Sequence, residues 1–127
     1  MNQRKTFVFN NCVGRDHADA FNRSDAFFDL NTYGRQENQA TELKVGERCV
    51  VAQAATPSDE IQFDTFLVKS IQFLPDKYTG DTCRVFCGKL RRSETLPRID
   101  ACAHPIYGVI FNKKTHFKQT SVVGVEA

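Results

Sequence analysis

The densest group of residues that could do chemistry is the stretch 111–118, which reads FNKKTHFK. Three lysines, Lys113, Lys114 and Lys118, stand with His116 between two phenylalanines. Ammonium groups hold phosphates and aromatic rings stack on bases, so this mixture suits a nucleic acid. A solvated loop between two strands, with both rings pointing inward, would have the same composition. The segment therefore predicts nucleic-acid contact, with a plain loop as the alternative.

More basic residues extend this region towards the middle of the chain: Arg84, Lys89, Arg91, Arg92 and Arg98. Arginine in particular grips a phosphate with two donors at once. The range 84–118 carries eight basic and two acidic residues, although the net charge of the whole chain is only +2. We therefore expect a positive surface whose partner is DNA or RNA. The alternative is a solvated strand edge, because Lys and Arg also protect edge strands against aggregation.

The cysteines raise the question of a metal site. Cys83 and Cys87 lie four positions apart and Cys102 precedes His104 by two, and thiolate and imidazole are the ligands that zinc prefers. A strand over 83–87 would hold its two sulfurs about 13 Å apart, too far for one tetrahedral ion. No metal and no other cofactor is predicted. Five cysteines among apolar neighbours instead indicate buried free thiols and a reducing, cytoplasmic location.

Catalytic motifs are missing from the sequence. The glycines are isolated, so they form no phosphate-binding loop, and neither Asp16 with His17 nor Cys102 with His104 matches a known catalytic pattern. Acid–base chemistry would have to use a small set of candidates, namely Glu47, Asp64, His17 and Lys44. The sequence favours a binding protein over an enzyme.

Composition places these residues in one domain, 1–127. The chain has 127 residues, of which 41% are hydrophobic and 25% charged, as in ordinary globular domains. No segment approaches the ~20 apolar residues that cross a bilayer, and the polar start MNQRK lacks a signal sequence. We expect no membrane partner, and the oligomeric state stays open.

The first half of the chain predicts one strand and two short helices. Phe7 and Phe9 alternate with smaller residues, which is typical of a strand over 5–10. Asp16 and Ser24 are good helix N-caps, and each precedes a short run with apolar residues at helical spacing. The second of these helices would carry Phe27, Phe28 and Leu30. The polar stretch 31–40 predicts a loop.

The second half predicts mostly strands. A glycine turn over 43–46 leads into a strand over 49–52, and the phase of alternation changes within 61–73, as at a β-bulge or corner. The range 83–87 predicts a strand with Arg84 and Phe86 on one face. A short helix and loop should occupy 91–105. Together these elements predict an α+β fold: a small curled, partly open β-barrel of five or six strands with two or three short helices.

The order of features resembles the PUA-like superfamily, especially the EVE, ASCH and YTH-type domains. The resemblance rests on an aromatic first strand (TFVFN), the run AFFDL, the segment LKVGERCVV that enters a strand, and the basic closing segment. In that superfamily a Val-Gly-Asp or similar turn often opens a barrel strand. Val45, Gly46 and Glu47 occupy that place, with Glu instead of Asp. The chain has no Trp, so it lacks the tryptophan cage of YTH-type readers.

The resemblance implies a barrel pocket that accepts a flipped or modified base, with basic residues around its mouth. Stacking and edge hydrogen bonds there would offset the few kcal/mol needed to extrude a base. The implied function is a nucleic-acid reader, working alone or as the recognition module of a nuclease or defence protein. An ASCH-like hydrolase of a nucleoside-type substrate and an interaction module for an acidic partner are the alternatives. The pocket candidates are Phe27, Phe28, Tyr33, Phe66 and Phe111, with Asn31 and Asn112 as readers of base edges.

Overall fold

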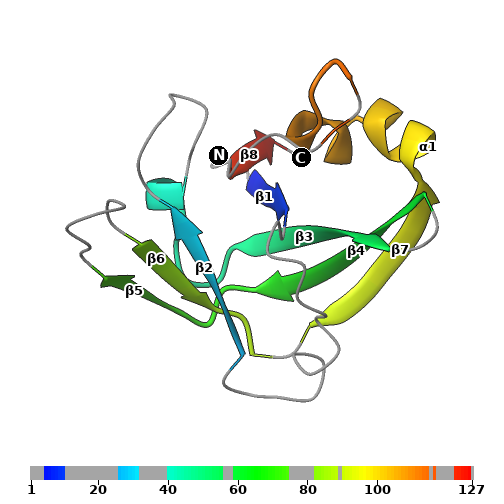
Figure 1. The fold of residues 1–127 in the computed structure, drawn as a ribbon. Coiled ribbons are helices and arrows are strands. Elements are labelled where there is room, and N and C mark those ends of the chain that lie inside the picture. The colour runs from blue at the N-terminus through cyan, green and yellow to red at the C-terminus, as the bar shows by residue number, and fades with distance from the viewer. Residues whose placement is uncertain are drawn as a thin grey trace.

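The structure is a computed structural model that describes residues 5–10, 26–31, 40–55, 59–74, 82–88, 90–114, 116 and 122–126. Strands dominate this part of the chain (Figure 1). The strands are β1 (Lys5–Asn10), β2 (Phe27–Asn31), β3 (Arg48–Ala55), β4 (Glu60–Leu67), β5 (Ser70–Leu74), β6 (Thr82–Phe86), β7 (Arg91–Pro97) and β8 (Val123–Glu126). The helices are α1 (Arg98–Ala103) and two 3-10 turns, η2 (Ala40–Glu42) and η3 (Tyr107–Ile110). Among the described residues, no helix is long and apolar enough to span a membrane.

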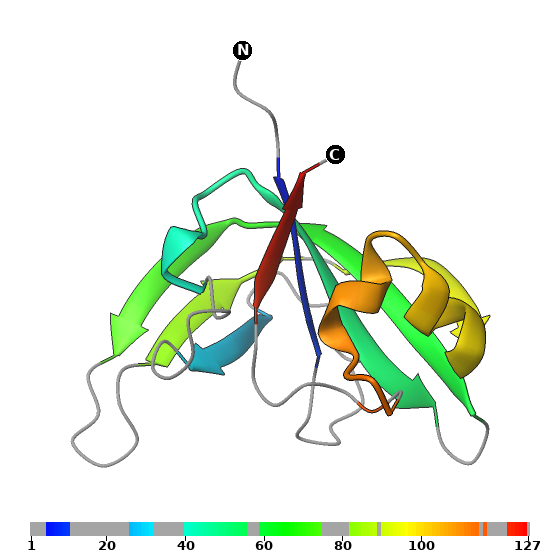
Figure 2. The same cartoon turned by 90° about the horizontal axis from the view of Figure 1, so that it is seen from above.

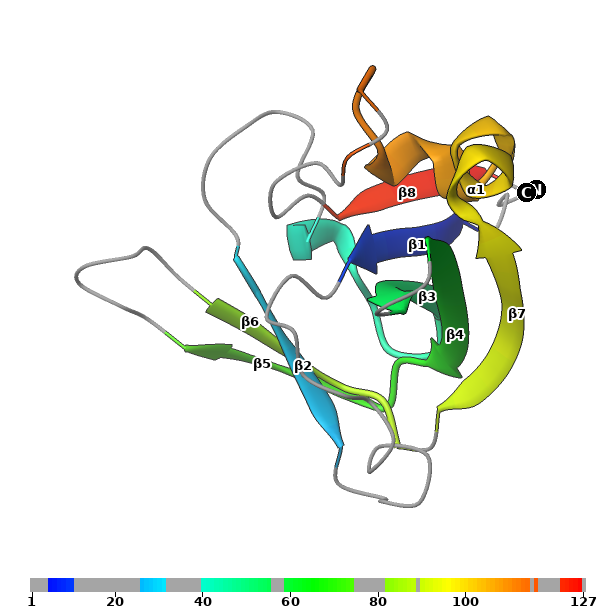
Figure 3. The same cartoon turned by 45° about the vertical axis from the view of Figure 1, so that its right-hand side comes forward.

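The strands form two separate sheets. Sheet A has the order β7-β4-β3-β1-β8, with β1 and β3 parallel and the other pairs antiparallel. Sheet B has the order β2-β6-β5 and is antiparallel throughout. The chain passes from sheet A to sheet B at Val68 and Lys69, and the sheets diverge from this corner (Figure 3). The predicted α+β class is confirmed, but the predicted partly open barrel is wrong, because the two sheets do not close on one another.

Sheet A is the middle of three layers. One core lies between the sheets and includes Phe7 and Phe9 of β1 with Cys83 and Val85 of β6. A second core lies on the other face of sheet A, where α1 and η3 cover Val8 and its neighbours (Figure 2). Alternate residues of β1 therefore enter different cores. This arrangement explains why the last four residues of β1 are all buried.

The alternation of buried residues changes phase along β4, and this change also arises from the two cores on opposite faces of sheet A. Ile61 and Phe63 face the helical layer, whereas Phe66 and Val68 face sheet B. Since the β3–β4 register is continuous, the pattern changes because a different face of the strand becomes covered. The predicted corner is present at Val68, and a register irregularity lies in the β4–β7 ladder between Phe63 and Asp64.

The sequence-based prediction for 25–31 is wrong, since a strand, β2, replaces the helix expected after Ser24. Phe28 and Leu30 point to the core while Phe27 and Asp29 point away from it, which is the period of a strand. Two adjacent phenylalanines and a leucine fit both periods, and pairing with β6 decides between them. The helix predicted after Asp16 and most of the loop predicted over 31–40 lie outside the described residues.

The C-terminal half also differs from expectation. Ser93 lies within β7 instead of capping a helix, and α1 begins only after Pro97, a residue that suits the start of a helix. The predicted strand after the turn at Gly46 is confirmed as β3, and Gly46 has a φ of 90°, which favours glycine. Pairing across both sheets raises the number of strands to eight among the described residues.

Candidate nucleic-acid interface

The outer face of sheet B, which points away from the core, presents aromatic and polar side chains to solvent. In one row of paired residues Phe27 lies beside Phe86, which lies beside Ser70. In the next row Asp29 lies beside Arg84, which lies beside Gln72. Phe27 is 41% exposed, and Ser70 and Gln72 are also exposed. We call these six residues the platform.

Arg84 is held at the centre of the platform between the Asp29 carboxylate and the Phe27 ring. Its Nε donates to Asp29 Oδ1 at 2.9 Å and its Nη2 to Asp29 Oδ2 at 3.2 Å. The guanidinium carbon lies 4.1 Å from the centroid of the Phe27 ring, and the Phe27 and Phe86 centroids are 5.6 Å apart. The hydrogen bonds to Asp29 raise the pKa of Arg84. Rings and guanidinium planes are the two surfaces on which proteins stack unpaired bases.

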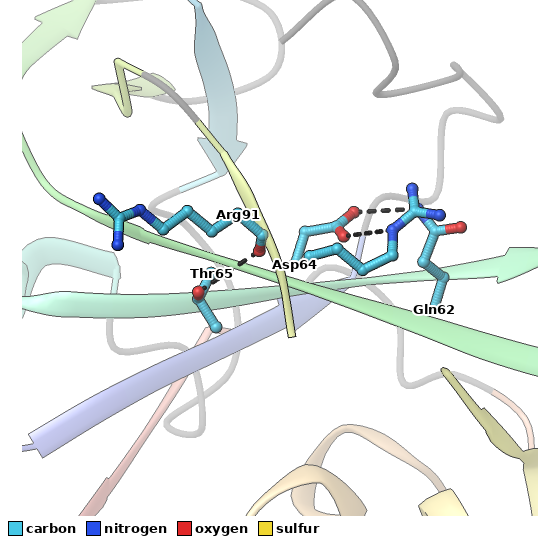
Figure 4. Close-up of polar contacts among 5 residues, drawn as sticks. Gln62, Asp64, Thr65 and Arg91 are labelled. Carbon is cyan, nitrogen blue, oxygen red and sulfur yellow. Dashed lines mark hydrogen bonds and ion pairs between the residues drawn. The ribbon is translucent and has the colours of Figure 1, made fainter. Parts of the chain in front are cut away.

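Two exposed cationic residues come near one end of the platform, Lys69 through a backbone hydrogen bond and Arg91 through its place in the sequence. The backbone N–H of Lys69 donates to the Phe86 carbonyl at 2.8 Å, so this exposed lysine lies next to the Phe27–Phe86 row. Arg91 opens β7 shortly after Phe86 and is also exposed. Figure 4 shows its guanidinium group pointing away from Asp64, while its carbonyl accepts a hydrogen bond from Thr65 Oγ1 at 3.4 Å. Lys89, which was predicted to join this group, lies outside the described residues.

Arg92 has a different environment from Arg91. Its Nε donates to Oδ1 of Asp64 at 3.3 Å, and Gln62 Nε2 donates to Oδ2 at 3.1 Å (Figure 4). Asp64 is fully buried, whereas the Arg92 side chain is 52% exposed. A buried carboxylate needs such partners because an unpaired charge in a protein interior is strongly destabilising. Asp64 and Arg92 thus join strands β4 and β7.

The turn at 112–114 is organised by Asn112. Its side-chain oxygen accepts hydrogen bonds from the backbone N–H groups of Lys114 at 2.9 Å and His116 at 3.1 Å. Lys113, Lys114 and His116 are exposed, and Lys118 lies outside the described residues. In Figures 1 and 3 this turn lies well away from the start of β7. The structure therefore does not bring these residues together with Arg91 and Arg92.

Most candidates for a base pocket have other surroundings. Phe66 and Phe111 are buried in the two cores, and Phe28 is partly buried and stacks on Phe66 with centroids 5.7 Å apart. Asn112 holds its own turn. Tyr33 lies outside the described residues, and for Asn31 only the backbone position in β2 is described. Of the predicted site residues, the structure brings together Phe28 with Phe66 in the core and Phe27 with Arg84 on an exposed face.

Sequence reasoning missed the partners Asp29, Ser70 and Gln72. The alternation in TCRVF does place Arg84 and Phe86 on one face of a strand. The pairing of β2 and β5 with β6, which completes the platform, has no signal in the sequence.

The candidates for acid–base chemistry are dispersed. Glu47 accepts a hydrogen bond from the backbone N–H of Lys44 within the turn before β3, and His17 lies outside the described residues. His104 Nδ1 accepts the N–H groups of Ile106 at 3.1 Å and Tyr107 at 3.2 Å, so its ring caps η3. Glu47 and His104 therefore organise turns.

Three thiols are buried in the core between the sheets, those of Cys49, Cys83 and Cys87. Burial raises the pKa of each, to about 11 for Cys87. Cys102 is partly exposed and is also a free thiol. Within the described ranges, no group of three or more His, Cys, Asp or Glu side chains could hold a metal ion. Cys12 lies outside those ranges.

Comparison with known proteins found no matching family model, no similar curated protein and no similar solved structure.

Proposed function

We propose that the protein binds single-stranded nucleic acid by stacking bases on the outer face of sheet B. The observation that carries this proposal is the arrangement of Arg84, whose guanidinium carbon lies 4.1 Å from the centroid of the exposed Phe27 ring and which donates two hydrogen bonds to Asp29. The exposed Phe27 ring and its Arg84 neighbour do not contribute to the hydrophobic core, because the core packs against the opposite face of sheet B.

The energy of binding would come mainly from stacking. Stacking of a base on an aromatic side chain contributes about 1–3 kcal/mol, and exposed sheets of this kind accept about two or three bases. Asp29 compensates the charge of Arg84, so Arg84 acts as a flat surface more than as a phosphate ligand. Phosphate contacts would come from Lys69 and Arg91. Ser70 and Gln72 offer hydrogen-bonding groups beside the stacked bases.

The proposed partner is still a nucleic acid, as the sequence predicts, but the proposed binding site is the platform on sheet B and not a pocket inside a barrel. A pocket built around Phe66 and Phe111 is not part of it, because both rings are packed in the cores. The PUA-like resemblance and the reading of a modified base stay predictions, and the platform mechanism does not depend on them.

The test is a binding titration of a fluorescently labelled single-stranded oligonucleotide with the parent protein and Phe27→Ala. Loss of one stacked base should weaken binding about 5- to 150-fold. The slope of log K against log salt should stay unchanged, because no phosphate contact is lost. Lys69→Ala should instead reduce that slope by about 0.7.

Ile99→Ala serves as the matched control, since Ile99 is an apolar side chain on α1 that is 76% exposed. It should bind like the parent. The proposal fails if the parent binds no oligonucleotide at low salt, or if Phe27→Ala binds as tightly as Ile99→Ala.

A further inference from the structure

The outer edge of sheet B is formed by β5, a strand without charged residues. Its sequence is SIQFL, and among the described strands it pairs only with β6. Phe73 on this strand is 56% exposed although it is a large apolar residue. An edge strand carries unpaired backbone N–H and C=O groups, which makes it a template for another strand.

The other three edges of the two sheets, as far as the described strands define them, carry charges that oppose self-pairing. Natural proteins protect their edges in this way. If β2 paired antiparallel with a second β2, its central residue Asp29 would face another Asp29. Two β7 strands paired about their centre would bring Glu94 opposite Glu94, and β7 also ends in Pro97. The short β8 ends in Glu126.

We propose that two copies of the chain associate through antiparallel pairing of their β5 strands, about a two-fold axis at Gln72. In this register the two Gln72 side chains face one another, and an amide both donates and accepts hydrogen bonds. Ile71 of each copy lies opposite Phe73 of the other, an aromatic and β-branched pair that stabilises antiparallel sheets. Ser70 lies opposite Leu74. No like charges meet.

Pairing would cover the exposed Phe73 ring and join the two three-stranded sheets into one continuous sheet. An isologous contact of this kind closes after two copies. One strand pair buries a small area, so the association should be weak and depend on concentration. The inference rests on the chemistry of the edge and is independent of nucleic-acid binding. If both hold, the dimer would carry two platforms on one sheet and bind long strands more tightly than short ones.

The experiment is sedimentation velocity of the parent chain between about 5 and about 500 µM, the range that suits weak interfaces. The parent should shift from monomer to dimer. Gln72→Lys and Gln72→Glu should each stay monomeric, because like charges would meet at the axis. An equal mixture of these two variants should recover the dimer, which shows that each variant is folded and that position 72 faces itself.

Thr95→Lys is the matched control, because it adds the same charge to an exposed position of another edge strand, β7. It should dimerise like the parent. The inference is overturned if the parent stays monomeric across the range, if Gln72→Lys associates as strongly as Thr95→Lys, or if the mixture stays monomeric. Species that keep growing beyond the dimer would also overturn it, since they indicate open-ended pairing.

Discussion

At the scale of single residues, the structure separates basic side chains that the sequence cannot tell apart. Arg84 lies over a ring and donates to an exposed carboxylate, Arg92 is the partner of a buried carboxylate, and Arg91 points away from that pair. Three arginines within nine positions thus have three environments. Their positive charge predicts that all three bind phosphate. Their actual neighbours differ because each side chain projects from a particular face of β6 or β7.

The Arg92–Asp64 pair gives a prediction for stability. Arg92→Met removes the guanidinium from a fully buried carboxylate and should lower the free energy of unfolding by about 1–3 kcal/mol. This loss is smaller than for a fully buried ion pair, because the Arg92 side chain is half exposed. Adding Asp64→Asn should recover part of this loss, since the uncompensated charge disappears. Urea denaturation measures both effects. Arg91→Met is the control and should change stability by less than about 0.5 kcal/mol; equal stability of Arg91→Met and Arg92→Met would contradict this role of Arg92.

The Cys87 thiol gives a prediction for pH dependence. Burial raises its pKa from 9.0 to about 11, so the folded protein holds this proton longer than the unfolded chain does. The stabilisation is complete below about pH 9 and is lost as the pH rises towards about 11. Between about pH 8 and about pH 10.5 the parent should therefore lose on the order of 2 kcal/mol more stability than Cys87→Ala does. Parallel pH profiles of the two proteins in urea denaturation would show that the thiol does not titrate in this way.

At the scale of elements, the sequence predicted a helix or strand correctly where the local pattern of apolar residues favours one type of secondary structure over the other. The apolar run at 49–52 is short and contains two β-branched valines, which favours a strand buried on both faces, and β3 is confirmed there. The run at 26–30 fits a helix or a strand, and contact with β6 decides for β2. The platform depends on that same contact: two of its six residues, Arg84 and Phe86, were predictable from β6 alone, and the other four required the register between strands.

The junction of α1 and η3 gives a prediction at this scale. A Cβ atom on Gly108 would lie 2.5 Å from the carbonyl oxygen of Cys102, so Gly108→Ala must push η3 away from α1. We expect a loss of about 2 kcal/mol or more. Gly46→Ala meets no atom within 4 Å and suffers only the strain of a φ of 90°, about 1 kcal/mol. Chemical denaturation should rank Gly108→Ala below Gly46→Ala, and the reverse order would show that the two helices are not packed as described.

At the scale of the whole molecule, the three layers explain why one sheet face is available for binding. Both faces of sheet A are covered, one by sheet B and the other by α1 and η3. Among the described residues, sheet B is packed against a core on its inner face only, so its outer face can carry Phe27, Arg84 and Phe86 without loss of core. The basic turn at 112–114 is a second exposed surface, and it lies beyond η3, away from sheet B (Figure 1). The two surfaces are therefore separable by experiment.

The most direct test is backbone amide chemical-shift mapping of the isotope-labelled protein during titration with a short single-stranded oligonucleotide. The largest changes should occur at Phe27, Arg84 and Phe86, with smaller changes at Lys69 and Gln72, and they should saturate together. Changes that are confined to residues 112–116, or the absence of any change at low salt, would contradict base stacking on the outer face of sheet B.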